Sequence, residues 1–98
     1  MTITKADLVE TISRQMAPAI TKRDVARIVQ LFLDELCRAL QEGNRVELRG
    51  FGVLTTKLRK PKVARNPRTK APVNLPPRRV PVFKASRLLK NSLSQVQP

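Results

Sequence analysis

Residues 57–81 read KLRKPKVARNPRTKAPVNLPPRRVP, and this stretch decides how the rest of the chain is organised. It contains nine Lys or Arg and six of the chain's eight prolines, with no Asp, Glu or aromatic residue. So little apolar surface cannot offset the entropy lost when a segment becomes ordered. We interpret the stretch as an extended, two-limbed basic arm that orders on a polyanion. Composition alone equally allows a solvated basic linker.

The net charge of +13 is confined to one half of the chain. Residues 1–47 carry seven basic and seven acidic side chains, whereas residues 48–98 carry thirteen basic and no acidic ones. This asymmetry indicates a neutral half that folds and a basic half that binds. Nucleic acid and an anionic membrane surface are the candidate partners.

The 98 residues are expected to form a single small domain, residues 1–98. Without the arm, a core of this size stabilises a fold only marginally, so a partner subunit is the natural remedy. One cysteine, Cys37, excludes an intrachain disulfide, and no signal peptide or membrane span is expected. The sequence therefore predicts a soluble intracellular protein.

Two helices are predicted in residues 1–43, the helical dimerisation part. Thr4-Lys5-Ala6-Asp7 resembles a capping box that opens the first helix, and Ala17-Pro18 ends it. The second helix begins after Thr21 and ends at Gly43, the residue type preferred just beyond a helix C-terminus.

The second helix carries an apolar stripe at steps of three and four residues. Its members are Val25, Ile28, Val29, Phe32, Leu33, Leu36 and Leu40. The stripe is wider than one short neighbouring helix can cover, which favours burial against a second chain. Cys37 lies in the same pattern and is expected to be a small buried hydrophobe.

Period-two alternation then predicts an antiparallel β-sheet over residues 45–83, which includes the arm at 57–81. Gly50-Phe51-Gly52 forms a turn between strands, and residues 79–83 return as a short strand that contains Phe83. A last helix, residues 84–95, begins near Ser86. The order predicts an α+β fold with helices on one face of the sheet.

The sequence contains no recognisable catalytic arrangement of residues. It has no histidine, its lone cysteine has no base partner in view, and no glycine-rich phosphate loop occurs. We expect no enzymatic activity, cofactor, metal or small-molecule substrate.

Two other binding roles are less compatible with the arm. A membrane-surface protein would need a long amphipathic helix with bulky apolar residues, whereas the basic stretch is broken by prolines. An arm without stacking aromatics argues against a dedicated single-strand binder, although RNA stays open as a secondary ligand.

Three blocks of sequence resemble the bacterial HU and integration host factor family of nucleoid-associated, histone-like DNA-bending proteins. They are GFG at 50–52, ARNPRT at 64–69 and RRVPVFKASRLLKNSL at 78–93, after a two-helix start. The resemblance runs from Thr4 to about Leu93. It implies an intertwined dimer with a helical body, an antiparallel β-sheet and extended β-ribbon arms that reach around double-stranded DNA in the minor groove. It also implies a place in the bacterial cytoplasm at the nucleoid, and a dimer core that contains Phe32, Leu36, Phe51 and Phe83.

The resemblance assigns DNA intercalation to Pro67. Its ring is apolar and rigid and has no backbone N–H to strand between bases; a simpler role is to shape the turn after Asn66. The resemblance also implies that Arg65 and Arg68 enter the minor groove, while Asn66 contacts base edges or holds the turn. The expected phosphate contacts are Lys57, Arg59, Lys60, Lys62, Lys70, Arg78, Arg79, Lys84 and Arg87.

The sequence departs from the family pattern at the arm tip, where Ala64 and Lys70 occupy positions usually held by glycine. We expect a looser or different turn there, because a Cβ is unfavourable at positive φ. Within the family, the very basic arm favours an HU-like homodimer with little sequence preference. An integration-host-factor-like heterodimer subunit with preferred sequences is the alternative.

Overall fold

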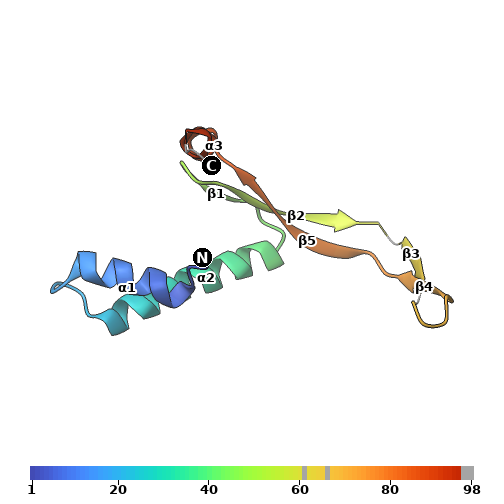
Figure 1. The fold of residues 1–98 in the computed structure, drawn as a ribbon, viewed down its shortest axis with the longest axis horizontal. Coiled ribbons are helices and arrows are strands. Elements are labelled where there is room, and N and C mark those ends of the chain that lie inside the picture. The colour runs from blue at the N-terminus through green and yellow to red at the C-terminus, as the bar shows by residue number, and fades with distance from the viewer. Residues whose placement is uncertain (61, 66, 96–98) are drawn as a thin grey trace. The chain divides into compact units, whose positions relative to one another are not determined.

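The computed structural model describes residues 1–60, 62–65 and 67–95. The chain divides into two compact units, Met1–Arg38 and Ala39–Pro98. Figure 1 shows the elements in order: two helices, a sheet that continues into a ribbon, and a short last helix.

The first unit is a pair of helices, α1 (Lys5–Met16) and the greater part of α2 (Lys22–Gln41). The predicted capping box is present: Asp7 N donates to Thr4 Oγ1 at 3.2 Å, and Thr4 N donates to Asp7 Oδ2 at 2.9 Å. Thr21 Oγ1 accepts a hydrogen bond from Asp24 N at 3.2 Å, so the second start signal also works as predicted.

Little of the apolar stripe is buried within one chain. Val9 and Val25, exposed by 6% and 3%, are the buried apolar residues among those that the structure describes. Phe32 is 51% exposed, Leu36 is half-buried and Cys37 is exposed. The expectation of a buried Cys37 is therefore wrong for the single chain, because α1 covers only part of the stripe.

The end of α2 is closed by two backbone hydrogen bonds. Asn44 N donates to Ala39 O at 2.9 Å and Gly43 N donates to Leu40 O at 3.0 Å, which is the Schellman pattern. Gly43 has φ +83°, a conformation that glycine adopts without steric penalty. Gly43 thus ends the helix, as predicted.

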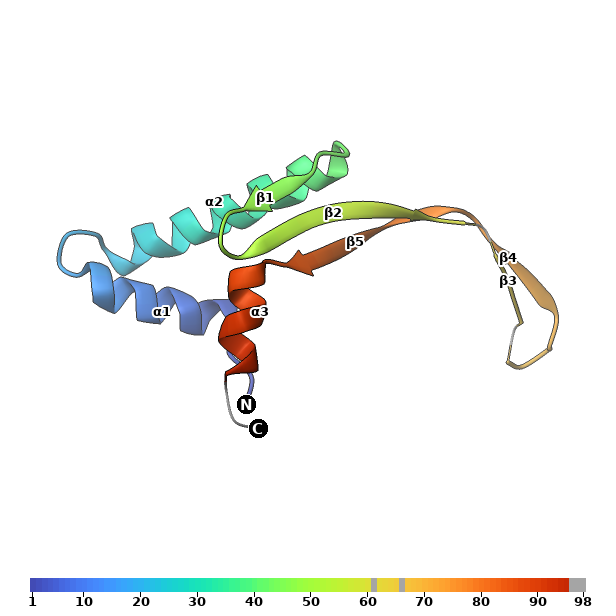
Figure 2. The same ribbon diagram turned by 90° about the horizontal axis from the view of Figure 1, so that it is seen from above.

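The second unit contains a three-stranded antiparallel sheet of order β1-β2-β5 (Figure 2). Its strands are β1 (Val46–Leu48), β2 (Gly52–Arg59) and β5 (Arg78–Ala85). The β2–β5 ladder runs from the pair Gly52 and Ala85 to the pair Arg59 and Arg78.

The last helix, α3 (Arg87–Ser94), follows β5 directly. Ser86 Oγ accepts from Leu89 N at 3.0 Å, so Ser86 is the predicted cap. The expected boundary between residues 83 and 84 is too early, because pairing with Gly52 keeps Ala85 in β5.

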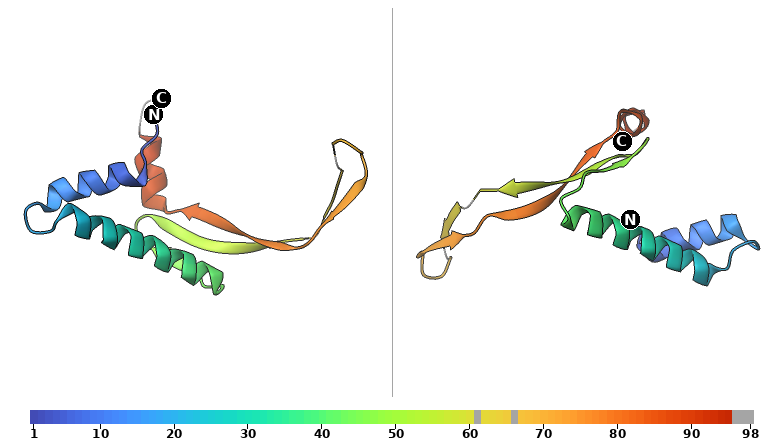
Figure 3. Two further views of the ribbon diagram at one scale, coloured as in Figure 1. Left: turned by 90° about the horizontal axis from the view of Figure 1, so that it is seen from below. Right: turned by 180° about the vertical axis from the view of Figure 1, so that it is seen from behind.

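Beyond the sheet the arm continues as a second ladder, formed by β3 (Lys62–Arg65) and β4 (Pro72–Leu75) (Figure 3). It pairs Lys62 with Leu75 and Arg65 with Pro72. The basic stretch is therefore a β-ribbon rather than a linker. Ala64 lies within this ladder, so it does not take part in the tip turn.

Candidate nucleic-acid interface

The register of the β2–β5 ladder sorts its side chains onto two faces. Paired residues share a face, and successive residues alternate between the faces. The pairs Lys57–Val80, Arg59–Arg78 and Val53–Lys84 therefore lie on one face. We call Lys57, Arg59, Arg78 and Lys84 the cationic face; all four are exposed.

The opposite face of the same ladder is mainly apolar, since it holds the pairs Leu54–Phe83, Thr56–Pro81 and Leu58–Arg79. Phe83 contacts Phe51, with ring centroids 5.1 Å apart and an interplanar angle of 40°. The two rings are 46% and 50% exposed, so these predicted core residues pack on each other but are not buried within one chain.

Arg79 differs from the other predicted phosphate contacts in β2 and β5. It pairs with Leu58, which puts it on the apolar face. Its guanidinium lies beside Gly43, because a β-carbon on Gly43 would be 3.2 Å from Arg79 Nη1.

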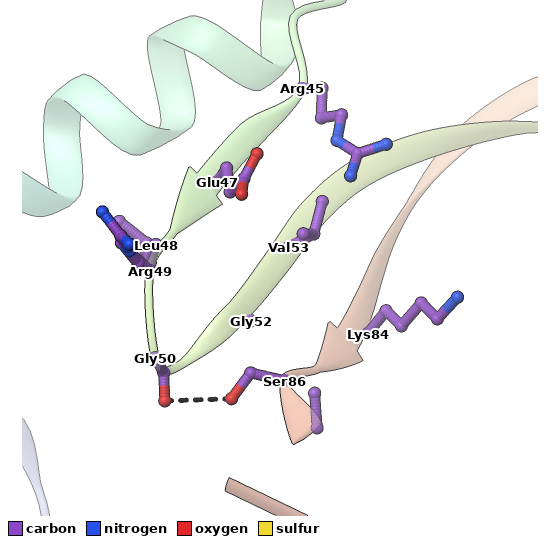
Figure 4. A pocket seen from close by; sticks show the side chains of 10 residues that line it. Arg45, Glu47, Leu48, Arg49, Gly50, Gly52, Val53, Lys84 and Ser86 are labelled. Atoms are coloured by element: carbon purple, nitrogen blue, oxygen red, sulfur yellow. Dashed lines mark hydrogen bonds between the residues drawn. The ribbon is translucent and has the colours of Figure 1, made fainter. Parts of the chain in front are cut away.

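The cationic face ends at the sheet in a shallow pocket of about 250 Å³ (Figure 4). Glu47, Val53 and Lys84 form one row across the three strands. Arg45 and Arg49 flank β1 and also line the pocket. The lining thus includes three basic side chains and one carboxylate, which leaves a net positive charge at this end of the face.

Arg45 and Arg49 were not among the sequence-based site residues. Their signal was present in the alternation of Arg45 and Glu47 with Val46 and Leu48, which puts the polar residues on one side of a strand. Which side carries the arm's cations depends on the pairing with β2 and β5, and the spacing within β1 does not reveal it.

At the other end of the arm, a turn joins β3 to β4. Arg65, Pro67 and Arg68 are exposed there, whereas Asn66 lies outside the described residues. Thr69 Oγ1 accepts from Ala71 N at 3.3 Å. Lys70 has φ +57°, so the turn needs a left-handed residue where the resemblance leads us to expect glycine.

The remaining predicted phosphate contacts lie in the middle of the arm and on the last helix. Lys60 is exposed between the two ladders, and Lys62 begins β3. Arg87 is the exposed first residue of α3. The structure thus distributes the predicted residues along the ribbon and the adjoining sheet instead of gathering them in one cleft.

Acidic side chains with clear partners lie in the first unit, away from the arm in the sequence. Glu10 pairs with Lys22 and with Arg14, and Glu35 pairs with Arg38. The hydrogen bond and charge of Lys22, followed by those of Arg14, lower the pKa of Glu10. Within the described part of the chain, no helix is long and apolar enough to cross a membrane.

Comparison with known proteins agrees with this architecture. The family described as Bacterial DNA-binding protein matches residues 3–94. The chain is 38% identical over 94 residues to integration host factor subunit alpha of Phenylobacterium zucineum, covering 96% of this chain and 92% of that protein.

Two solved structures have a similar fold. A chain of an Anabaena HU–DNA cocrystal structure superposes with a TM-score of 0.87 and 28% identity, covering 96% of this chain and all of that one. A mutant HU from Thermotoga maritima, at 24% identity, superposes with a TM-score of 0.67 over 93% of this chain and 99% of that one, and supports the fold alone. Because the family match spans nearly the whole sequence, the chain belongs to the bacterial DNA-binding protein family of HU and integration host factor.

Proposed function

We propose that the protein acts as a dimer that binds double-stranded DNA in the minor groove and bends it, mostly without sequence specificity, at the bacterial nucleoid. The observation that carries this proposal is the gathering of the cationic face along a ribbon that leads to an exposed Pro67. The architectural, DNA-binding character of the family agrees with it.

The cationic face supplies the affinity. Lys57, Arg59 and Arg78 extend along the arm, and Lys84 continues the face onto the sheet. Residues 48–98 contain no carboxylate that could compete with phosphate for these cations. A protein that neutralises about six to ten phosphates loses roughly 10³–10⁵-fold in affinity when the salt rises from about 50 to about 200 mM, so binding should be strongly salt-dependent.

The tip supplies the bend. Pro67 would insert between base pairs while Arg65 and Arg68 enter the minor groove beside it. Unstacking a step costs about a few kcal/mol, which the additional backbone contacts of bent DNA offset. Asn66 would contact base edges or hold the turn.

A dimer follows from the exposure of the body. Phe32, Phe51 and Phe83 are each about half exposed in one chain. A second chain that buries these rings together with Leu36 would complete a core that the single chain lacks.

The test compares intact, nicked and four-way-junction DNA at about 50 and about 200 mM salt. Bending is followed by energy transfer between dyes at the DNA ends, for the parent, Pro67→Ala and the matched arm variant Pro76→Ala. Intercalation predicts that Pro67→Ala loses bending and the preference for deformable sites but keeps salt-sensitive binding. Pro76→Ala should retain both. Equal bending by the parent and Pro67→Ala would remove Pro67 from the mechanism.

The 38% identity to an integration host factor alpha subunit favours a second candidate, a heterodimer subunit with preferred DNA sequences. Native mass spectrometry of the purified chain separates the two candidates. A stable homodimer that binds unrelated duplexes equally supports the first candidate. A chain that stays monomeric, and dimerises only with a related subunit, supports the second.

A further inference from the structure

Arg79 is a residue type that commonly contacts DNA, but its position in the sheet does not suit a DNA contact. Arg78 and Arg79 are adjacent in β5, yet Arg78 shares the cationic face with Arg59 while Arg79 lies opposite Leu58 on the apolar face. Adjacent residues of a strand point to opposite sides of the sheet. A DNA duplex that tracks the cationic face would therefore meet Arg78 and not Arg79.

The guanidinium of Arg79 has a protein neighbour instead. A β-carbon on Gly43 would lie 3.2 Å from Arg79 Nη1, 3.7 Å from Nη2 and 3.9 Å from Cζ. These three atoms of the guanidinium thus lie close to Gly43, although the Arg79 residue as a whole is exposed. Gly43 is the residue at which the Schellman motif closes α2.

The chemistry of this contact suits an arginine. The last carbonyl groups of a helix carry the negative end of its dipole, which favours a cation within the final turn. A planar guanidinium can lie flat against a backbone that has no side chain, whereas an ammonium group is a compact point charge. The absence of a side chain at Gly43 therefore serves both the positive φ and the approach of Arg79.

We propose that Arg79 is a positioning residue that holds the base of the arm against the C-terminal end of α2, and that it does not contact phosphate. Arg59 and Arg78 form the last pair of the β2–β5 ladder, one pair beyond Leu58 and Arg79. Arg79 thus lies close to the point where the arm leaves the sheet. The inference deepens the proposed function, since it concerns the direction in which the DNA-binding ribbon is presented.

The first test needs no DNA. Hydrogen exchange of the amides of residues 56–59 and 78–80 is compared in the free parent protein, Arg79→Ala and the matched neighbour Arg78→Ala. Loss of one charge–dipole contact predicts about threefold to fivefold faster exchange in Arg79→Ala. Arg78→Ala should leave exchange unchanged. Unchanged exchange in Arg79→Ala would overturn the proposal.

A variant on the other side of the contact checks the geometry. Gly43→Asn keeps a residue that tolerates positive φ but adds a side chain where Arg79 lies. It should accelerate the same amides and should not add to the effect of Arg79→Ala. Gly50→Asn is the control for backbone strain, because Gly50 has φ +84° and, among the described residues, a β-carbon there would meet Leu88 Cδ1 alone, at 3.9 Å. Faster exchange in Gly50→Asn than in Gly43→Asn would contradict the proposed contact.

The second test measures how affinity for a duplex depends on salt. Arg78→Ala should reduce the slope of log K against log salt by about one per arm, whereas Arg79→Ala should leave the slope unchanged. Arg79→Lys keeps the charge but loses the planar fork, so the positioning role predicts exchange between that of the parent and that of Arg79→Ala, whereas a phosphate contact predicts exchange as in the parent. An equal loss of slope in the two alanine variants would make Arg79 a phosphate contact. If the parent protein fails to bind duplex DNA, the proposed function falls, while the exchange experiment still decides the role of Arg79.

Discussion

Lys70 adopts a left-handed backbone conformation in the tip turn. Its φ of +57° is unfavourable for a residue with a β-carbon, by roughly 1–2 kcal/mol. The turn nevertheless forms next to a short ladder in which Arg65 pairs with Pro72. Substitutions at Lys70 can therefore test the backbone conformation of the turn separately from the charge of the side chain.

Lys70→Asn and Lys70→Val remove the same charge, but only asparagine tolerates the left-handed conformation. We expect Lys70→Val to bind nicked DNA about fivefold more weakly than Lys70→Asn, equivalent to about 1 kcal/mol of turn strain. Binding titrations of the two variants at one salt concentration measure the difference. Equal affinities would show that the turn does not need this conformation when DNA is bound.

Gly52 is required for a different reason, the close approach of β5. A β-carbon there would lie 2.5 Å from Phe83 Cε1 and 2.6 Å from Lys84 O. Gly52→Ala should therefore lower the free energy of unfolding by about 3 kcal/mol, because a backbone oxygen cannot rotate away as a side chain can. Urea unfolding of the parent protein and Gly52→Ala measures this loss of stability, with Thr56→Ala, a small change in the same strand, as the control. A loss below about 1 kcal/mol would mean that the two strands can separate at this point.

The capping box at the first turn of α1 contributes to the stability of this helix. The hydrogen bond from the Thr4 backbone N–H, and then that from the Thr4 side chain, lower the pKa of Asp7 below its usual range. A carboxyl with a lower pKa in the folded state adds stability above its unfolded pKa of about 4. That stability is lost as the pH falls through the folded value.

Asp7→Asn should therefore be less stable than the parent protein at neutral pH, and the difference should shrink as the pH falls below about 4. Thermal unfolding at a series of pH values measures the difference. Thr4→Ala removes the partner and should reproduce the trend. A difference that is independent of pH would show that the charge of Asp7 does not contribute to the cap.

In the molecule as a whole, a single chain leaves many of its large apolar side chains exposed, and this limits its stability. Ile28, Phe32, Leu88 and Leu93 are between 51% and 68% exposed in one chain. Such a chain cannot bury enough apolar surface to remain folded alone. Its stability should therefore depend on the concentration of subunits.

The melting temperature should thus rise with protein concentration. Phe83→Ala should lower the free energy of unfolding by about 3–5 kcal/mol, so that a higher protein concentration is needed to reach the same melting temperature. Calorimetry over a hundredfold range of concentration tests this, with sedimentation as the check on mass. Leu58→Ala, exposed on the arm at 65%, is the control and should have little effect. A melting temperature that does not change with concentration would contradict a shared core.

The features that the sequence alone determined are local ones. The capping box at Thr4 and Asp7, the stop at Gly43 and the Ser86 cap each depend on residues within one or two turns, so spacing was enough to predict them. Confinement of the positive charge to residues 48–98 is likewise a property of the chain itself.

The tertiary structure decided which side of the ribbon each cation occupies. Alternation within β5 separates Arg78 from Arg79, but only the pairing with β2 and the approach of Gly43 reveal which of the two belongs to the cationic face. The same pairing brings β5 against Gly52. Register and close approach arise between segments far apart in the sequence, and for that reason no local pattern contains them.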